Sequence, residues 1–125
     1  MLGKKKRIQI AALRDNLSSD LRDHIQRIFP IELYWCSNVI EVSLTNMNGI
    51  FHPLMMLMNA GRIEDTGGDF RLYADGLTCS VANAMQALDR VRVEIAHAFG
   101  FRGSSAVEIS NNCYDQSFTD FVELA

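Results

Sequence analysis

The chain has 125 residues, of which 48% are apolar and 22% are charged, and these values are typical of one globular domain or a fragment of one. Its formal net charge is −3 and its pI is near 5.5, which argues against nucleic acid as the main partner, because phosphate binding depends on clustered positive charge. No apolar run approaches the roughly 18 residues of a transmembrane helix, and no secretory signal follows the N-terminal lysines. We therefore expect a cytoplasmic protein without a membrane partner.

The three cysteines, Cys36, Cys79 and Cys113, lie far apart in the sequence. Their odd number argues against a disulfide framework, and the lack of any C-x-x-C pair argues against a zinc site. We predict no metal site.

The N-terminal segment joins a basic cluster to an apolar run. We interpret the cluster, Lys4 to Arg7, as the solvated start of a strand, with a phosphate-binding patch as the alternative. The apolar run from Ile8 to Leu13 predicts a short buried strand.

A helix and a second strand are predicted next. Apolar residues recur at helical spacing from Leu17 to Ile28, Ser18 or Ser19 can cap that helix, and Pro30 closes the segment. The short aromatic run Ile31 to Cys36 predicts a strand. This order of elements predicts a β-α-β-like tail that enters a helical domain.

One histidine, His52, stands inside an apolar run between two groups of asparagines, after a helix that Asn38 can cap over residues 39–44. Such a residue is either a packed, hydrogen-bonded core histidine or a proton carrier, because imidazole takes and gives a proton near neutrality. A helix that begins near Pro53 would place His52 at or just before its start. The backbone N–H groups there would favour an anion such as a substrate carboxylate.

The clearest helix is predicted from Thr78 to Phe99, with Thr78 as its cap and Gly100 at its C-terminus. Its apolar residues step by threes and fours: Val81, Met85, Leu88, Val91, Ile95 and Phe99. Two pairs on this helix are spaced for ion pairs with a structural role: Arg90 with Glu94, and Asp89 with Arg92. The alternative is that part of this helix borders an active cleft.

Two other segments are less regular. Arg62 to Gly68 has paired acids and paired glycines and predicts a turn. Ser110 to Ala125 is ambiguous, although Phe118, Phe121 and Val122 indicate a final short helix.

Two blocks of the sequence carry a family resemblance. The first reads NVIEVSLTNMNGIFHP, followed by LMNAGRIEDTGG, and the second reads FRLYADGLTCSVANAMQALDRVRVEIAHAFGF. In this order and spacing, Asn38 to Phe101 resembles the C-terminal domain of the octopine and nopaline dehydrogenases, the opine dehydrogenase family. The preceding segment is similar to the last strand and helix of the family's nucleotide-binding domain.

The resemblance implies a mainly α fold, in which a helical 6-phosphogluconate-dehydrogenase-like C-terminal domain follows a short β-α-β tail of a Rossmann domain. We therefore expect residues 1–37 to end a dinucleotide-binding domain, and residues 38–125 to form a truncated helical substrate domain. The chain has no G-x-G-x-x-G turn, so the site for NAD or NADP is expected to lie largely outside it. The chain alone should be inactive.

Opine dehydrogenases reductively condense an amino acid with a 2-oxo acid, such as pyruvate, using NADH or NADPH. The resemblance implies that His52 is the general acid/base of this reaction. Its orienting partner in the family resembles an aspartate; Asp69, Asp75 and Asp89 are the candidates in the matched region, yet we expect that aspartate beyond Ala125. The proposed substrate-binding residues are Asn46, Asn48, Asn59 and Tyr73.

Two alternatives stay open. The asparagine amides can equally cap a helix or satisfy buried backbone groups. The whole chain can also be a non-catalytic helical dimerisation or interaction module, which leaves a homodimer open. Sequence alone does not name the amino acid.

Overall fold

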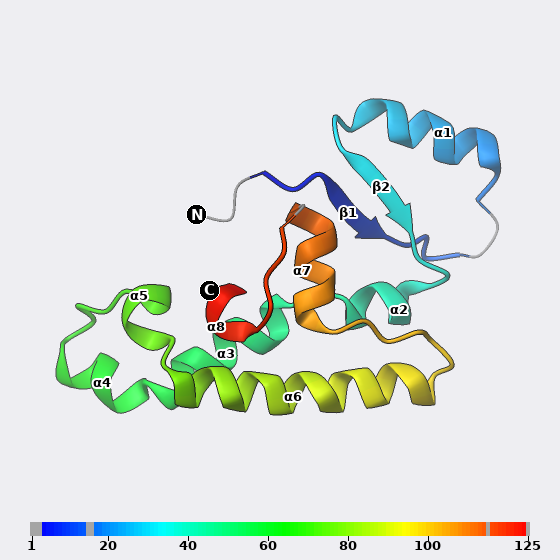
Figure 1. The fold of residues 1–125 in the computed structure, drawn as a ribbon. Coiled ribbons are helices and arrows are strands. Elements are labelled where there is room, and N and C mark those ends of the chain that lie inside the picture. Colours follow the sequence, from blue (N-terminus) through cyan, green and yellow to red (C-terminus); the bar gives the residue numbers. More distant parts are fainter. Residues whose placement is uncertain (1–3, 15–16, 115, 125) are drawn as a thin grey trace.

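A β-α-β unit forms the N-terminal part of the computed structural model, which describes residues 4–14, 17–114 and 116–124 (Figure 1). Its elements are β1 (Arg7–Ile10), α1 (Ser19–Ile28) and β2 (Glu32–Trp35). The two strands are parallel, with Arg7 opposite Glu32, and α1 lies in the connection between them. The predicted strand-helix-strand order is therefore confirmed, although β1 ends at Ile10 rather than at Leu13.

The start of α1 follows from one side chain. Ser18 is the N-cap, and its Oγ accepts a hydrogen bond from the Leu21 N–H at 3.3 Å. This bond satisfies one of the donors that a helix start leaves open. The helix ends at Ile28, before Pro30, as the sequence predicts.

Seven helices make up the rest of the described chain: α2 (Val39–Leu44), α3 (Asn48–Met58), α4 (Ala60–Asp65), α5 (Leu72–Gly76), α6 (Cys79–Ala98), α7 (Ala106–Tyr114) and α8 (Phe121–Leu124). The long helix α6 runs along the bottom of Figure 1, and α3 and α8 pack against it. The predicted caps of α2 and α6, Asn38 and Thr78, both accept hydrogen bonds from first-turn N–H groups. The mainly α fold with a short β-α-β tail is therefore confirmed.

The core lies where α3, α6, α7 and α8 meet. Met55 and Met85 are completely buried, and the rings of Phe51 and Phe121 lie 5.8 Å apart. The flexible methionine side chains fill the space between these helices. Val81 is buried in the same cluster.

The apolar stripe predicted along α6 is only partly covered. Its first two members, Val81 and Met85, are buried, but Leu88, Val91, Ile95 and Phe99 are between 41% and 58% exposed. Helical spacing identifies which residues share a face, but it does not say how far along the helix a partner extends.

The prediction of a turn from Arg62 to Gly68 is wrong for the first half of this segment. Residues 62–65 belong to α4, and only residues 66–68 form the turn. Gly67 and Gly68 have φ angles of 61° and 89°, which favour glycine because other side chains rarely adopt this conformation. Paired glycines therefore mark the helix end correctly, while the paired acids continue the helix.

Of the two ion pairs predicted on α6, Arg90 and Glu94 form none in the described structure, whereas Asp89 and Arg92 do, with 2.8 Å between Arg92 Nη2 and Asp89 Oδ1. The side chains of Asp89 and Arg92 are only 5% and 10% exposed. Arg92 also donates to the carbonyls of Leu44 and Ser104, and Asp89 accepts from the Ala106 N–H at 2.9 Å. The pair therefore joins α6 to the end of α2 and the start of α7, which makes it more than a helix-surface contact.

None of the helices in the described ranges combines the length and the apolar composition needed to cross a membrane.

Candidate functional site

His52 lies in the middle of α3. The expectation that a helix begins near Pro53 is wrong, because α3 starts at Asn48 and contains Pro53 in its interior. Proline removes one backbone hydrogen bond there, but Ile50 and Met55, on either side of it, are buried in one core and hold the helix through this point. The N–H groups at the helix start therefore do not surround His52, and they cannot hold a substrate carboxylate beside it.

The ring of His52 meets Tyr73, which α5 carries. His52 Nε2 lies 2.8 Å from Tyr73 Oη, and the two rings meet edge to face with their centroids 6.0 Å apart. Which of the two groups donates the proton depends on the histidine tautomer. His52 is exposed and Tyr73 is 46% exposed, so this pair is open to a ligand rather than sealed in the core.

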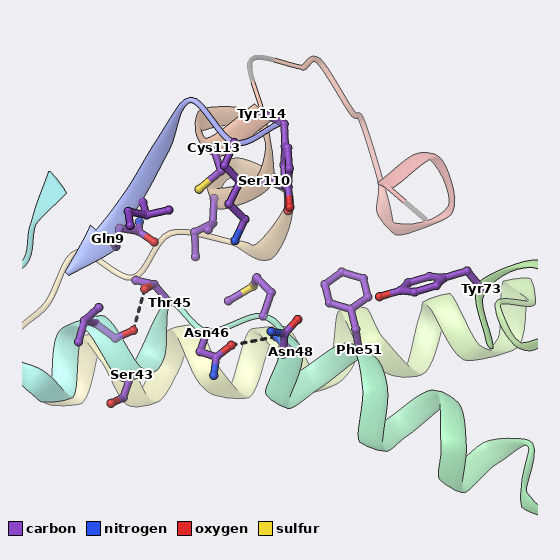
Figure 2. Close-up of a pocket in the computed structure, with 15 residues that line it drawn as sticks. Gln9, Ser43, Thr45, Asn46, Asn48, Phe51, Tyr73, Ser110, Cys113 and Tyr114 are labelled. Carbon is purple, nitrogen blue, oxygen red and sulfur yellow. Dashed lines mark hydrogen bonds between the residues drawn. The ribbon is translucent and has the colours of Figure 1, made fainter. Parts of the chain in front are cut away.

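A pocket of about 510 Å³ lies between the N-terminal strand β1, the α2–α3 segment and α7 (Figure 2). Asn46, Asn48, Phe51 and Tyr73 line it, and Figure 2 shows the Tyr73 hydroxyl directed toward the Phe51 ring. His52 is not among the lining residues. Its link to the pocket is the hydrogen bond to Tyr73.

The asparagines divide into two groups. Asn46 Oδ1 accepts the Asn48 N–H at 3.2 Å, so Asn46 supports the start of α3 while facing the pocket (Figure 2). Within the described part of the chain, the side-chain amide of Asn48 has no hydrogen-bond partner, which leaves it available to a ligand.

Asn59, by contrast, is buried away from the pocket. Its Nδ2 donates to the Met55 carbonyl at 2.8 Å and to the Gly76 carbonyl at 3.0 Å, and it thereby ties α3 to the end of α5. Its amide thus satisfies buried backbone groups, one of the two interpretations that the sequence left open.

The family model for the "NAD/NADP octopine/nopaline dehydrogenase, alpha-helical domain" matches residues 35–125. The chain belongs to this family. An opine dehydrogenase from Arthrobacter sp. (strain 1C) is 41% identical over 80 residues, which cover 64% of this chain and 22% of that enzyme. A vitopine synthase from Allorhizobium ampelinum (strain ATCC BAA-846 / DSM 112012 / S4) is 27% identical over 124 residues, which cover 99% of this chain and 34% of that protein.

The chain thus spans between a fifth and about a third of the length of these relatives. No solved structure matches it.

The three aspartates that were candidates to orient His52 do not contact it. Asp75 forms an ion pair with Arg71. The buried carboxylate of Asp89 forms an ion pair with Arg92 and accepts a hydrogen bond from the Ala106 N–H. Asp69 makes no side-chain hydrogen bond to His52 in the described structure. The group that does contact the imidazole is the Tyr73 hydroxyl.

The pair of Asp75 and Arg71 holds α5, the helix that carries Tyr73. Asp75 accepts hydrogen bonds from both the backbone and the side chain of Arg71, at 2.9 and 3.0 Å. The side-chain bond and then the backbone bond lower the pKa of Asp75 to about 2. At neutral pH this carboxylate is therefore charged and caps the first turn of α5.

The buried thiols are poor nucleophiles. Burial, and secondly the nearby charge of Glu41, raises the pKa of Cys36 to about 11. Burial also raises the pKa of Cys113, which lines the pocket. Both thiols are protonated at neutral pH. Among the described residues, no group of three or more His, Cys, Asp or Glu side chains is arranged to hold a metal ion.

Sequence reasoning missed the pocket residues contributed by α7, by β1 and by the segment just before β1, which include Lys5, Gln9, Ser110 and Tyr114. They come from segments about a hundred residues apart that meet when α7 packs beside β1. Of these residues, the sequence pointed only to Lys5 as a possible ligand contact, because Lys5 belongs to the basic cluster.

Proposed function

We propose that this chain is the helical, substrate-side part of an opine dehydrogenase that reductively condenses an amino acid with a 2-oxo acid, such as pyruvate, using NADH or NADPH. Family membership over residues 35–125 supports the class of reaction. The single observation that carries the site is the hydrogen bond between His52 and Tyr73 at the edge of a pocket that Asn46 and Asn48 line.

We further propose the domain division at residue 37. The parallel β1-α1-β2 unit supports residues 1–37 as the end of a dinucleotide-binding domain, and residues 38–125 then form the helical substrate domain. The described residues do not fit the cofactor itself, because the segment after β1 contains no glycine and the chain has no G-x-G-x-x-G turn. The site for NAD or NADP would therefore lie largely outside this chain.

His52 is the proposed general acid/base. Condensation of an amine with a ketone requires a proton at the oxygen that leaves as water, and an imidazole can both give and take a proton near neutral pH. His52 does not line the pocket, but its hydrogen-bond partner Tyr73 does. The proton would therefore pass between His52 and the substrate oxygen through the Tyr73 hydroxyl.

Substrate binding is proposed for Asn46, Asn48 and Tyr73, which all line the pocket. The free side-chain amide of Asn48 supports this role most directly. Asn59 was also expected to bind substrate, but its hydrogen bonds to Met55 and Gly76 favour a structural role.

The test uses the protein encoded by the complete reading frame that contains this chain. Oxidation of NADH and of NADPH is followed with pyruvate, in the presence and absence of a panel of amino acids. We expect oxidation only when both substrates are present, with a product whose mass is their sum plus two hydrogens and minus one water. Oxidation that does not depend on an amine would contradict the proposal.

A second candidate function is a non-catalytic interaction module. It is favoured by the exposed apolar face of α6, formed by Leu88, Val91, Ile95 and Phe99, because a face of this kind marks contact with another chain or domain. Sedimentation of the isolated chain tests it. A stable dimer that is unaffected by NADH, pyruvate or amino acids supports a structural role, and a strictly monomeric chain counts against it.

A further inference from the structure

The pocket carries one positive charge and, in the described residues, no negative charge. Lys5 is the single charged side chain among the described residues that line it. The polar side chains around it are neutral amides and hydroxyls, among them Asn46, Asn48 and Ser110. Because no described residue of the lining carries a carboxylate, this cation is available to an anionic ligand.

The structure holds Lys5 against α7. Its Nζ lies 5.7 Å from the centre of the Tyr114 ring, and the next residue, Lys6, donates its backbone N–H to the Cys113 carbonyl at 2.8 Å. The charge also acts on the pocket wall. Burial raises the pKa of Cys113, and Lys5 is the first of two cations that oppose this rise.

We propose that this pocket binds the carboxylate of a small acid, with Lys5 as the charge partner and the amides of Asn46 and Asn48 as neutral donors. This inference rests on the proposed function, in which the amino acid and the 2-oxo acid both carry a carboxylate. It gives Lys5 a role that the sequence alone did not assign.

The lining favours a carboxylate over a phosphate. Phosphate sites usually combine several cations or free backbone N–H groups at a helix start. Here one lysine is present, and the N–H groups of Asn48, Gly49 and Ile50 at the start of α3 are already bonded to Asn46 or Met47. One cation with side-chain amides matches a singly charged ligand.

The test is a titration of the 125-residue chain, labelled with ¹⁵N, with pyruvate and separately with L-alanine. We expect saturable shifts at Asn46, Asn48 and Ser110, and weaker binding of methyl pyruvate, which lacks the charge. An ion pair between an exposed lysine and a carboxylate is worth about a two- to fivefold difference in affinity. Lys5→Gln should therefore weaken pyruvate binding by this factor, and Lys5→Arg should retain it.

Lys4→Gln is the matched control, because Lys4 belongs to the same cluster but does not line the pocket. The affinities from the pyruvate titration and the L-alanine titration are compared to show which substrate supplies the carboxylate. Inorganic phosphate is the third probe, and phosphate binding tighter than that of both acids would overturn the proposal.

Equal affinities in the wild type and in Lys5→Gln, or no saturable binding by either acid, would also overturn it. Turnover in the NAD(P)H assay is measured separately, so the two proposals can fail independently. Carboxylate binding without amine-dependent turnover would reject the dehydrogenase and leave the anion site standing.

Discussion

Two polar pairs, Asp89–Arg92 on α6 and His52–Tyr73 between α3 and α5, show how burial separates structure from function in this chain. The Asp89–Arg92 pair is almost fully enclosed and bonds to three other backbone groups. The His52–Tyr73 pair is exposed and makes one hydrogen bond at the edge of a pocket. We infer that the first holds helices together, while the second is free to exchange protons with a ligand.

The largest expected effect follows from breaking the buried pair. Asp89→Ala removes the partner of Arg92 and the acceptor of the Ala106 N–H, and it leaves a cation buried. Loss of one member of such a pair costs about 3–5 kcal/mol. Chemical denaturation should show this loss, whereas Glu94→Ala, at an exposed position on the same helix, should change the unfolding free energy little. A loss below about 1 kcal/mol would place Asp89 outside the structural framework.

Asn59→Ala tests whether Asn59 has a structural role in joining α3 to the end of α5. The change removes two hydrogen bonds to buried carbonyls and should cost about 2–3 kcal/mol, from roughly one for each bond and the penalty of unpaired groups. Asn83→Ala, at an exposed position on α6, is the control. If Asn59→Ala lowers substrate affinity but leaves stability unchanged, the original assignment of Asn59 to substrate binding is right.

Tyr73→Phe should affect function far more than stability. It removes the hydroxyl that His52 contacts but keeps the ring, so the unfolding free energy should fall by less than about 1 kcal/mol. The ¹⁵N chemical shifts of the His52 ring should change, because its Nε2 loses the hydrogen bond to the Tyr73 hydroxyl. Tyr34→Phe, at an exposed position on β2, should leave these shifts unaltered. Identical His52 shifts in the wild type and in Tyr73→Phe would mean that the pair does not persist in solution.

The smallest expected effect concerns the support of α5. The folded pKa of Asp75, about 2, lies below the ordinary value of about 3.9, so its contribution to stability is present above pH 4 and is lost as the pH falls through 2. Arg71→Ala should raise this pKa toward the ordinary range, as the carboxyl ¹³C shift against pH would report. Arg90→Ala on α6 should leave it unchanged. The same titration curve for Asp75 in the wild type and in Arg71→Ala would exclude Arg71 as the cause.

The sequence predicts elements where local chemistry decides them, and it fails where tertiary packing does. Ser18, Asn38 and Thr78 cap helices as predicted, because a cap needs only its own side chain and the next turn. Pro53 misled the prediction, because the buried residues on both sides of it outweigh its lost hydrogen bond.

The site shows the same division. His52 could be selected from its own chemistry and the family resemblance, and Asn46 and Asn48 from their nearness to it. That Tyr73 rather than an aspartate meets the imidazole depends on how α5 folds back on α3, and that Lys5 lines the pocket depends on the packing of β1 beside α7. Neither contact leaves a signal in residue spacing.

The most direct test of the account is the turnover of His52→Asn in the complete enzyme, compared with its unfolding free energy. Loss of a general acid/base should lower the rate by about 10²–10⁴-fold, while stability should change by less than about 1 kcal/mol because the side chain is exposed and makes one hydrogen bond. His24→Asn, at an exposed position on α1, is the control and should retain full activity. Near-normal turnover in His52→Asn would contradict the role that we assign to this histidine.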